Sequence, residues 1–265
     1  MAAKKTIYYT DELNDDFAGN DINTKRVPPD FKFLHSGRAW RVIQFILYYF
    51  VALPIVYIAA KLYLGLRFED RKNLKKAGKG GVFLYGNHTR DLDAFVPALA
   101  AFPRRADIVC NPDAVSIPGL RTLVQMFGAL PLPTEFSGML SFMNALFACV
   151  KNGDCVTIYP EAHVWPFYTG IRPFKADSFC YPMKNLTPVV AMVTRYTKRR
   201  GLFALCRRPG MTVSFSEPFY PDPSLGLRKG QQQLRDEVYA FMCEKAALPG
   251  NVEYIHYVKK SDIGA

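Results

Sequence analysis

The stretch that decides the fold is GGVFLYGNHTRDLDAFVPALAAF, residues 80–102. Its first part, residues 82–85, is a short apolar run bounded by glycines, which predicts a buried β-strand. From Asp91 onward the apolar residues recur at helical spacing behind a residue that can cap a helix. A strand, a short polar loop and a helix in this order form the unit from which α/β sheets are built.

The same alternation continues along the rest of the chain. Further strands are predicted at residues 106–110, 128–132, 155–159, 186–193 and 211–219. Helices are predicted at residues 120–127, 137–151 and 229–247. We therefore expect an α/β fold with a mostly parallel central sheet flanked by helices.

Three regions are predicted from the composition. Residues 1–37 form a polar N-terminal arm, an extension or a loosely docked strand to which we assign no chemistry. Residues 38–66 form a membrane-anchoring helical hairpin. Residues 67–265 form the α/β domain. The first 25 residues contain acids and have no apolar core, so they do not resemble a signal peptide.

The helical segment contains 19 uncharged residues, 42–60, which could span about 28 Å as one helix. Pro54 lies within this run, where it would break or kink a helix, and Lys and Arg flank the run on both sides. A spanning helix normally has its basic excess on one side only. The pattern favours a hairpin of two helices that enters one leaflet and returns; a single-pass helix and a buried core helix are the alternatives. A hairpin would place the protein on the cytoplasmic face of the cell membrane.

The net charge of the chain restricts the classes of partner but does not identify one. The chain has a net charge of +11, which indicates a polyanionic partner such as an anionic membrane surface, a phosphorylated small molecule or nucleic acid. Zinc-finger spacing and recognisable nucleic-acid-binding motifs are absent from the sequence, so we expect no nucleic acid. The six cysteines are scattered without a C-x-x-C pair, which is typical of a reducing compartment.

His88 and Asp93 are the strongest candidates for chemistry in the opening stretch. His88 follows the carboxyl end of a predicted strand, where open α/β sheets place their ligand sites. The two side chains can meet if His88 lies in the loop and Asp93 in the first turn of the helix. A carboxylate bonded to one imidazole nitrogen leaves the other free to accept a proton. This pair, with no serine or cysteine nucleophile beside it, suits activation of a substrate hydroxyl.

Another stretch, CVTIYPEAHVWPFYTGIRPFKADSF at residues 155–179, places a glutamate after another predicted strand. Residues 80–102 and 155–179 together resemble the glycerolipid acyltransferase superfamily, which includes lysophosphatidic acid and glycerol-3-phosphate acyltransferases. Asn87, His88 and Asp93 fit the family's N-H-x4-D motif, and Tyr159-Pro160-Glu161 resembles the start of its F-P-E-G-T-R motif. Phe174-Lys175 is similar to the family's downstream F-K-x-G. Residues 186–193 resemble its fourth motif, which is apolar and contains proline. Residues 128–133 stand where its second motif belongs. The likeness extends over roughly residues 75–217.

The resemblance implies transfer of an acyl group from an acyl-thioester, either acyl-CoA or acyl carrier protein, to a lipid hydroxyl. His88 would be the general base and Asp93 its orienter, with direct attack on the thioester and no metal or other cofactor. Glu161 would hold the polar head of the acceptor. The other residues that we expect to contact substrate are Asn87, Arg90, Arg121, His163, Arg172 and Lys175.

Two departures from the family pattern bear on the acceptor. Thr134 stands where the second block usually ends in arginine, and Ala162-His163-Val164 replaces the Gly-Thr-Arg of the third. In the family those arginines hold the acceptor phosphate. Either Arg90, Arg121 or Arg172 takes their place for a lysophosphatidate-like acceptor, or the acceptor is another lyso-lipid, such as an amino-acid lipid or a glycolipid. A non-catalytic membrane lipid-binding protein on the same fold is the competing class.

Overall fold

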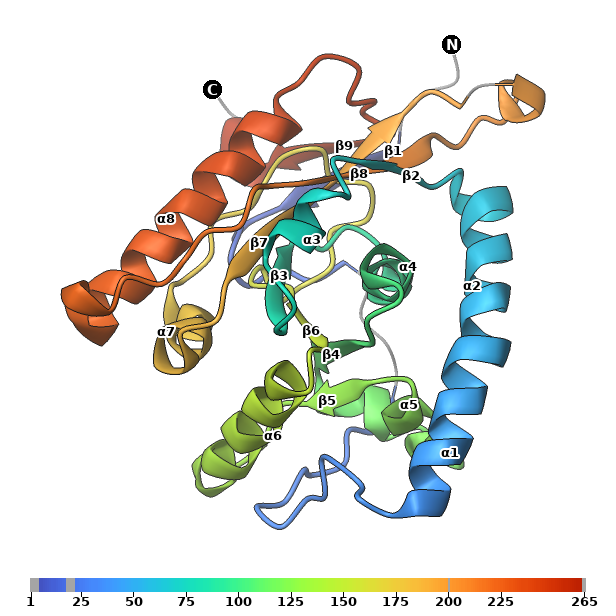
Figure 1. Cartoon of the computed structure of the whole chain (residues 1–265). Coiled ribbons are helices and arrows are strands. Elements are labelled where there is room, and N and C mark those ends of the chain that lie inside the picture. Colours follow the sequence, from blue (N-terminus) through green and yellow to red (C-terminus); the bar gives the residue numbers. More distant parts are fainter. Residues whose placement is uncertain (1–4, 18–21, 200, 264–265) are drawn as a thin grey trace.

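The computed structural model describes residues 5–17, 22–199 and 201–263. Within them, seven strands form one sheet in the order β2-β8-β7-β3-β6-β4-β5 (Figure 1). The strands are β2 (Arg67–Glu69), β3 (Val82–Gly86), β4 (Ala106–Cys110), β5 (Ala129–Pro131), β6 (Cys155–Ile158), β7 (Val189–Thr197) and β8 (Gly210–Phe215). Each strand predicted from an apolar run is present, with ends that differ by a few residues.

The sheet is mostly parallel, as the sequence predicted. β3 lies at its centre and pairs in parallel with β6 and β7, so that Phe83 is opposite both Val156 and Val189. β4 and β5 continue the parallel part, whereas β8 runs antiparallel to β7. The carboxyl ends of β3 and β6 therefore meet at one edge of the sheet, which is where such folds place a ligand site.

Helices cover both faces of the sheet, which explains why its central strands are apolar throughout. Phe83 and Tyr85 of β3 face the cluster formed with α6, α7 and α8, whereas Val82 and Leu84 face the cluster with α4 and the N-terminal helix. The helices of the domain are α3 (Asn73–Lys76), α4 (Val96–Ala101), α5 (Arg121–Met126), α6 (Met139–Lys151), α7 (Cys180–Asn185) and α8 (Gly226–Ala246). Short 3-10 turns lead into several of them, including Asp91–Phe95 before α4.

The apolar N-terminal segment forms one helix of 27 residues, Arg38–Leu64, and not the two-helix hairpin that we expected. It consists of α1 (Arg38–Ile46), a π-helical turn (Leu47–Ala52), α2 (Leu53–Ala59) and a second π-helical turn (Ala60–Leu64). The π-helical turn explains why Pro54 does not end the helix. The Leu53 N–H donates to the Tyr48 carbonyl five residues back, and this wider turn accommodates the proline ring.

The helix lies along the edge of the domain and packs against α4 (Figure 1). Tyr48, Leu53 and Leu64 are buried against the domain, and the Tyr48 hydroxyl accepts a hydrogen bond from the Ala106 N–H. Large apolar side chains on its other faces are exposed: Val42, Ile43, Phe45, Ile46, Phe50, Val51, Ile55, Tyr57, Ile58, Leu62 and Tyr63. By length and composition the helix could cross a membrane.

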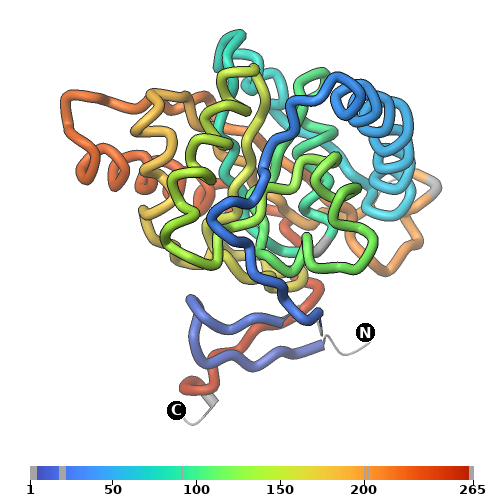
Figure 2. The backbone as a smooth tube through the Cα atoms, turned by 90° about the horizontal axis from the view of Figure 1, so that it is seen from below, coloured from blue at the N-terminus to red at the C-terminus, as the bar shows by residue number. Residues whose placement is uncertain are grey.

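The described part of the N-terminal arm is docked against the domain and is not loosely attached. Its strand β1 (Lys5–Tyr9) pairs in parallel with β9 (Ile255–Lys259), and Figure 2 shows the two beside each other below the main body. Further along the arm, Val27, Phe31 and Phe33 are buried in the core. No local sequence pattern predicts this docking, because the pairing joins β1 and β9, which lie at opposite ends of the sequence.

Candidate active site

The polar site lies where β3 and β6 end, and Asn87 fixes its central loop to β7. The Asn87 side-chain amide donates to the Thr194 carbonyl at 3.1 Å and accepts from the Thr194 N–H at 2.8 Å. Asn87 is 1% exposed. The structure therefore uses Asn87, which we expected to contact substrate, to hold the loop that carries His88.

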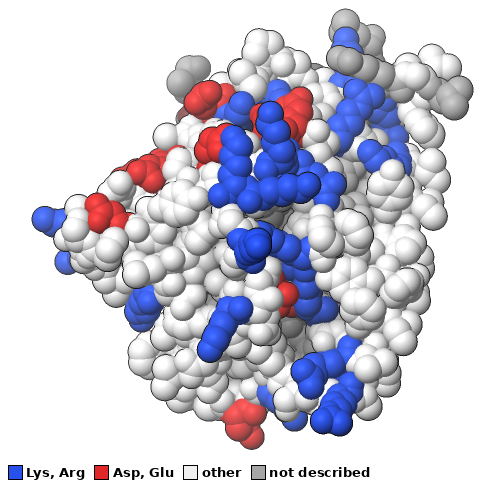
Figure 3. All heavy atoms as spheres, viewed as in Figure 1, with Lys and Arg blue, Asp and Glu red and all other residues white. Residues whose placement is uncertain are grey.

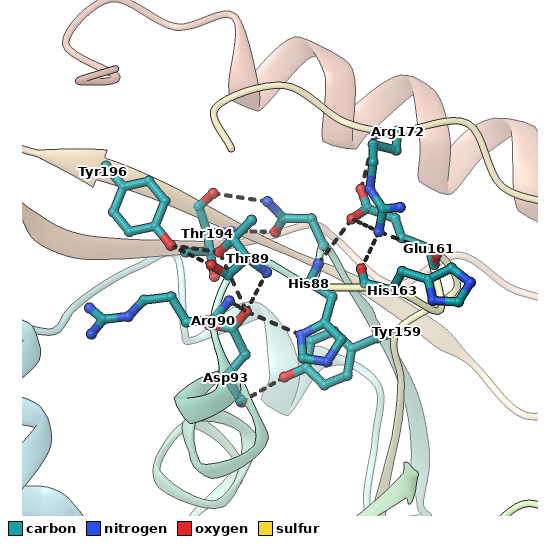
Figure 4. A network of polar contacts seen from close by, with 11 residues as sticks. His88, Thr89, Arg90, Asp93, Tyr159, Glu161, His163, Arg172, Thr194 and Tyr196 are labelled. Atoms are coloured by element: carbon teal, nitrogen blue, oxygen red, sulfur yellow. Dashed lines mark hydrogen bonds and ion pairs between the residues drawn. The ribbon is translucent and has the colours of Figure 1, made fainter. Parts of the chain in front are cut away.

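His88 and Asp93 face each other, with His88 Nδ1 3.4 Å from Asp93 Oδ2 (Figure 4). The same Asp93 oxygen accepts hydrogen bonds from the N–H groups of Thr89 at 2.6 Å and Arg90 at 2.8 Å. The Asp93 side chain is 1% exposed, whereas the His88 side chain is 18% exposed. Because Asp93 faces Nδ1, the imidazole nitrogen available to a substrate is Nε2.

Two tyrosines support the His88–Asp93 pair and its loop. The Tyr159 ring stacks on the His88 ring with centroids 4.5 Å apart, and its hydroxyl donates to the Asp93 carbonyl at 2.7 Å. Burial raises the pKa of Tyr159 well above its usual value, so the hydroxyl stays protonated as a donor. The Tyr196 hydroxyl donates to Thr89 Oγ1 at 2.7 Å. The sequence predicts none of these contacts, although Tyr159 is the first residue of the stretch that resembles the F-P-E-G-T-R motif.

Glu161 is brought to His88, but its carboxylate is occupied by the protein itself. The His88 N–H donates to Oε2 at 3.1 Å, and the Arg172 N–H donates to Oε1 at 3.0 Å. The Arg172 guanidinium adds a bond from Nη2 to Oε2 at 3.4 Å. Burial raises the pKa of Glu161, an effect that the Arg172 charge and the two N–H groups oppose. In this arrangement Glu161 positions the His88 backbone.

Arg172 is the centre of a buried network that joins the N-terminal arm to the site. Its side chain is 1% exposed, and its nitrogens donate to the backbone carbonyls of Glu161, His163 and Glu12. Its guanidinium lies 5.0 Å from the centroid of the Trp165 ring. Figure 4 shows it beyond Glu161, on the side away from the His88 ring. Arg172 is therefore not exposed to a substrate phosphate.

Trp165 connects the third motif to both ends of the chain. It is fully buried, and its Nε1 donates to the Asp15 carbonyl at 2.7 Å. Its ring contacts Tyr9 and Phe17 of the arm and stacks on Tyr257 of β9 at 5.0 Å. The loop after β6 is thus held from outside by the small β1–β9 sheet.

The remaining predicted residues are placed separately. Arg90 is half-buried beside the pair, with its guanidinium over the rings of Phe167 at 4.9 Å and Tyr63 at 5.5 Å. His163 Nδ1 lies 3.7 Å from a carboxylate oxygen of Asp16, and its ring points away from His88 (Figure 4).

Lys175 is exposed. Arg121 is exposed at the start of α5, with its guanidinium 4.7 Å from the Phe31 ring. Thr134, which stands in place of an arginine, bonds the backbone of Val27 through its hydroxyl. Of the three arginines that we considered as phosphate ligands, Arg90 alone lies next to the His88 loop with a partly accessible side chain.

The fold and the order of the sequence motifs agree with those of an acyltransferase domain. The acyltransferase family model matches residues 65–195, a range that contains the His88 and Glu161 blocks. This range is similar to the acyltransferase family and agrees with the resemblance to the glycerolipid acyltransferases. No curated protein matches the sequence.

A solved structure shares this fold. It is the 1-acyl-sn-glycerophosphate (LPA) acyltransferase PlsC from Thermotoga maritima, with a TM-score of 0.51 and 16% sequence identity. The superposition covers 78% of this chain and 91% of that chain. The similarity supports the predicted architecture.

Proposed function

We propose that the protein transfers an acyl group from an acyl-thioester to a hydroxyl of a lyso-glycerolipid at a membrane surface. The observation that carries this proposal is the His88–Asp93 contact at the carboxyl end of β3, with Asp93 held by two backbone N–H groups. The family and its fold support acyl transfer in general. The thioester donor and the lipid acceptor are our inference.

In the proposed reaction, His88 Nε2 removes the proton from the acceptor hydroxyl as its oxygen attacks the thioester carbonyl. The tetrahedral intermediate then breaks its carbon–sulfur bond, and the leaving thiolate takes the proton from the imidazolium. The products are the ester and the free thiol. Asp93 fixes the imidazole orientation and stabilises its positive charge during the transfer.

The apolar helix Arg38–Leu64 supports a site of action at the membrane. Its exposed apolar residues would otherwise face water over much of its length. We expect the cytoplasmic face, because all six cysteines are free and scattered.

Two classes of lyso-lipid are candidates for the acceptor. A lysophosphatidate-like acceptor is the simplest reading of the family and would use Arg90 for its phosphate. A lyso-lipid without a phosphomonoester, such as an amino-acid lipid or a glycolipid, is favoured by a specific observation. Arg172 is committed to Glu161 and to carbonyls. Val164 stands where the family carries an arginine, and Asp16 lies beside the neighbouring His163.

A substrate panel tests both candidates. The purified full-length chain is incubated in mixed vesicles with acyl-CoA or acyl carrier protein and with each lyso-lipid in turn, and release of free thiol is measured with ester formation. Turnover of lysophosphatidate with loss in Arg90→Ala supports the first candidate. Turnover of phosphate-free acceptors alone eliminates it, and no turnover of any lyso-lipid by either donor contradicts the proposed function.

A further inference from the structure

A basic site, distinct from the His88–Asp93 site, lies at the carboxyl end of the apolar helix. A cavity of about 190 Å³ is formed there by the last turn of the helix, the start of β2 and the segment after β7. Four cationic side chains line it: Lys61, Arg67, Lys198 and Arg199. Among the described residues that line the cavity, none carries a carboxylate. Cations gathered without acids around a small cavity attract an anion.

The backbone brings these side chains together through a close approach at Gly65. Gly65 has φ +58°, which ends the helix in the left-handed conformation, and a Cβ there would meet the Gly210 backbone at 3.4 Å. Arg199 Nη1 donates to the Leu62 carbonyl at 3.1 Å, and Nη2 donates to the Tyr63 carbonyl. Arg199 thus offsets the negative end of the helix dipole, which would otherwise repel an anion.

Among the residues that the structure describes, no acid forms an ion pair with Arg67 or Lys198. Glu69 is two residues after Arg67 in β2, but it bonds the guanidinium of Arg195 at 2.6 Å and the Ser214 hydroxyl at 2.7 Å. Arg67 and Lys198 are both exposed. Their charges are therefore available to a ligand in the cavity.

The position of the cavity indicates which anion it takes. Lys61 belongs to the last turn of the apolar helix, and the neighbouring Leu62 and Tyr63 are exposed. In Figure 3, Lys and Arg gather across the face of the molecule beside this helix, whereas the helix edge itself is almost uncharged. An anion with an apolar tail would contact both surfaces at once, which a soluble phosphate could not do.

We propose that this cavity binds the phosphate of an anionic phospholipid headgroup while the lipid chains lie along the exposed face of helix Arg38–Leu64. The inference rests on the membrane association proposed above and adds to it a specific headgroup site, separate from the His88–Asp93 pair. The phosphate oxygens accept hydrogen bonds from Lys61, Arg67 and Lys198. The site would hold the enzyme at the membrane with its helix in the interface.

Vesicle binding of the purified full-length chain tests the proposal. Binding is measured by flotation with phosphatidylcholine vesicles and with vesicles that also contain phosphatidylglycerol. The test variant is Arg67→Ala/Lys198→Ala. The matched control, Arg228→Ala/Lys229→Ala, removes two exposed cations from α8, which lies across the sheet from the helix (Figure 1). Thermal melts of both variants show whether the fold is retained.

We expect the wild-type chain to prefer the anionic vesicles and the test variant to bind them about 30-fold more weakly, at roughly fivefold per charge. The control variant should bind within about twofold of wild type. Equal binding of wild type and test variant to anionic vesicles would refute headgroup binding in the cavity and leave membrane association standing. Equal binding of wild type to both vesicles would do the same and leave membrane association standing.

Binding to neither vesicle would overturn membrane association and the headgroup site together, while acyl transfer to dispersed lyso-lipid would still report on the enzyme. Millimolar inorganic phosphate and coenzyme A serve as soluble competitors. Little displacement of the anionic vesicles at constant ionic strength supports a lipid headgroup. Displacement by coenzyme A at that ionic strength would instead assign the cavity to a soluble phosphate ligand and refute the proposal.

Discussion

Replacement of Arg172 by methionine should destabilise the fold far more than it changes substrate affinity. The change leaves the Glu161 carboxylate buried without its counter-ion, and breaking a buried ion pair from one side costs about 3–5 kcal/mol. The carbonyls of Glu12 and His163 also lose a charged donor, so we expect a total of roughly 4 kcal/mol or more. For a chain of this size that corresponds to a fall in Tm of about 8–16 °C.

The assay is thermal unfolding followed by circular dichroism in mild detergent, with Glu161→Gln and the double variant Glu161→Gln/Arg172→Met as partners. In Glu161→Gln/Arg172→Met no buried carboxylate is left unpaired, so the double variant should recover at least about 2 kcal/mol relative to Arg172→Met. The double variant also keeps the test possible if Arg172→Met does not fold. An Arg172→Met protein that melts within about 2 °C of wild type but has a tenfold higher KM for the lyso-lipid would show that Arg172 binds substrate.

Two further changes test the site and a half-buried carboxyl outside it. Asp93→Asn removes the charge that orients the general base, so kcat should fall by about 10² to 10⁴ while KM for the acceptor changes little; an unchanged kcat would exclude that role. Burial and the nearby Asp107 charge raise the pKa of Asp154 to about 7, partly offset by Arg105, with Cys149 beside them. Because deprotonation of Asp154 is disfavoured in the folded state, the stability of the wild type should fall as pH rises from 5 to 8. Asp154→Asn should be more stable than wild type by roughly 1 kcal/mol at pH 8, allowing for the partial exposure of Asp154, and by less at pH 5. Parallel pH profiles of Tm for the two proteins would contradict this assignment.

The sheet was predictable because its central strands are covered on both faces and therefore appear as short apolar runs. Val82–Gly86 and Cys155–Ile158 are of this kind, and each is bounded by glycine or proline. The position of His88 relative to Asp93 followed from the same local unit, since a strand, a loop and a helix start fix both side chains. Local sequence was sufficient wherever both partners belong to one strand–loop–helix unit.

Long-range contacts were not predictable in this way. The Arg172 nitrogens reach Glu12, and Trp165 reaches Asp15, across more than half the chain. Arg172 was among the residues expected to contact substrate, because a sequence pattern does not show what buries a guanidinium. Pro54 was expected to break the helix, because the π-helical turn that accommodates it is a backbone adjustment without a sequence signature.

The most direct test of the central claim is the rate of acyl transfer by His88→Ala, measured as free thiol released and ester formed in the same vesicles. If His88 is the general base, the rate should fall by at least about 10³-fold, with vesicle binding and Tm close to wild type. A His88→Ala protein that transfers the acyl group within tenfold of the wild-type rate would contradict the account.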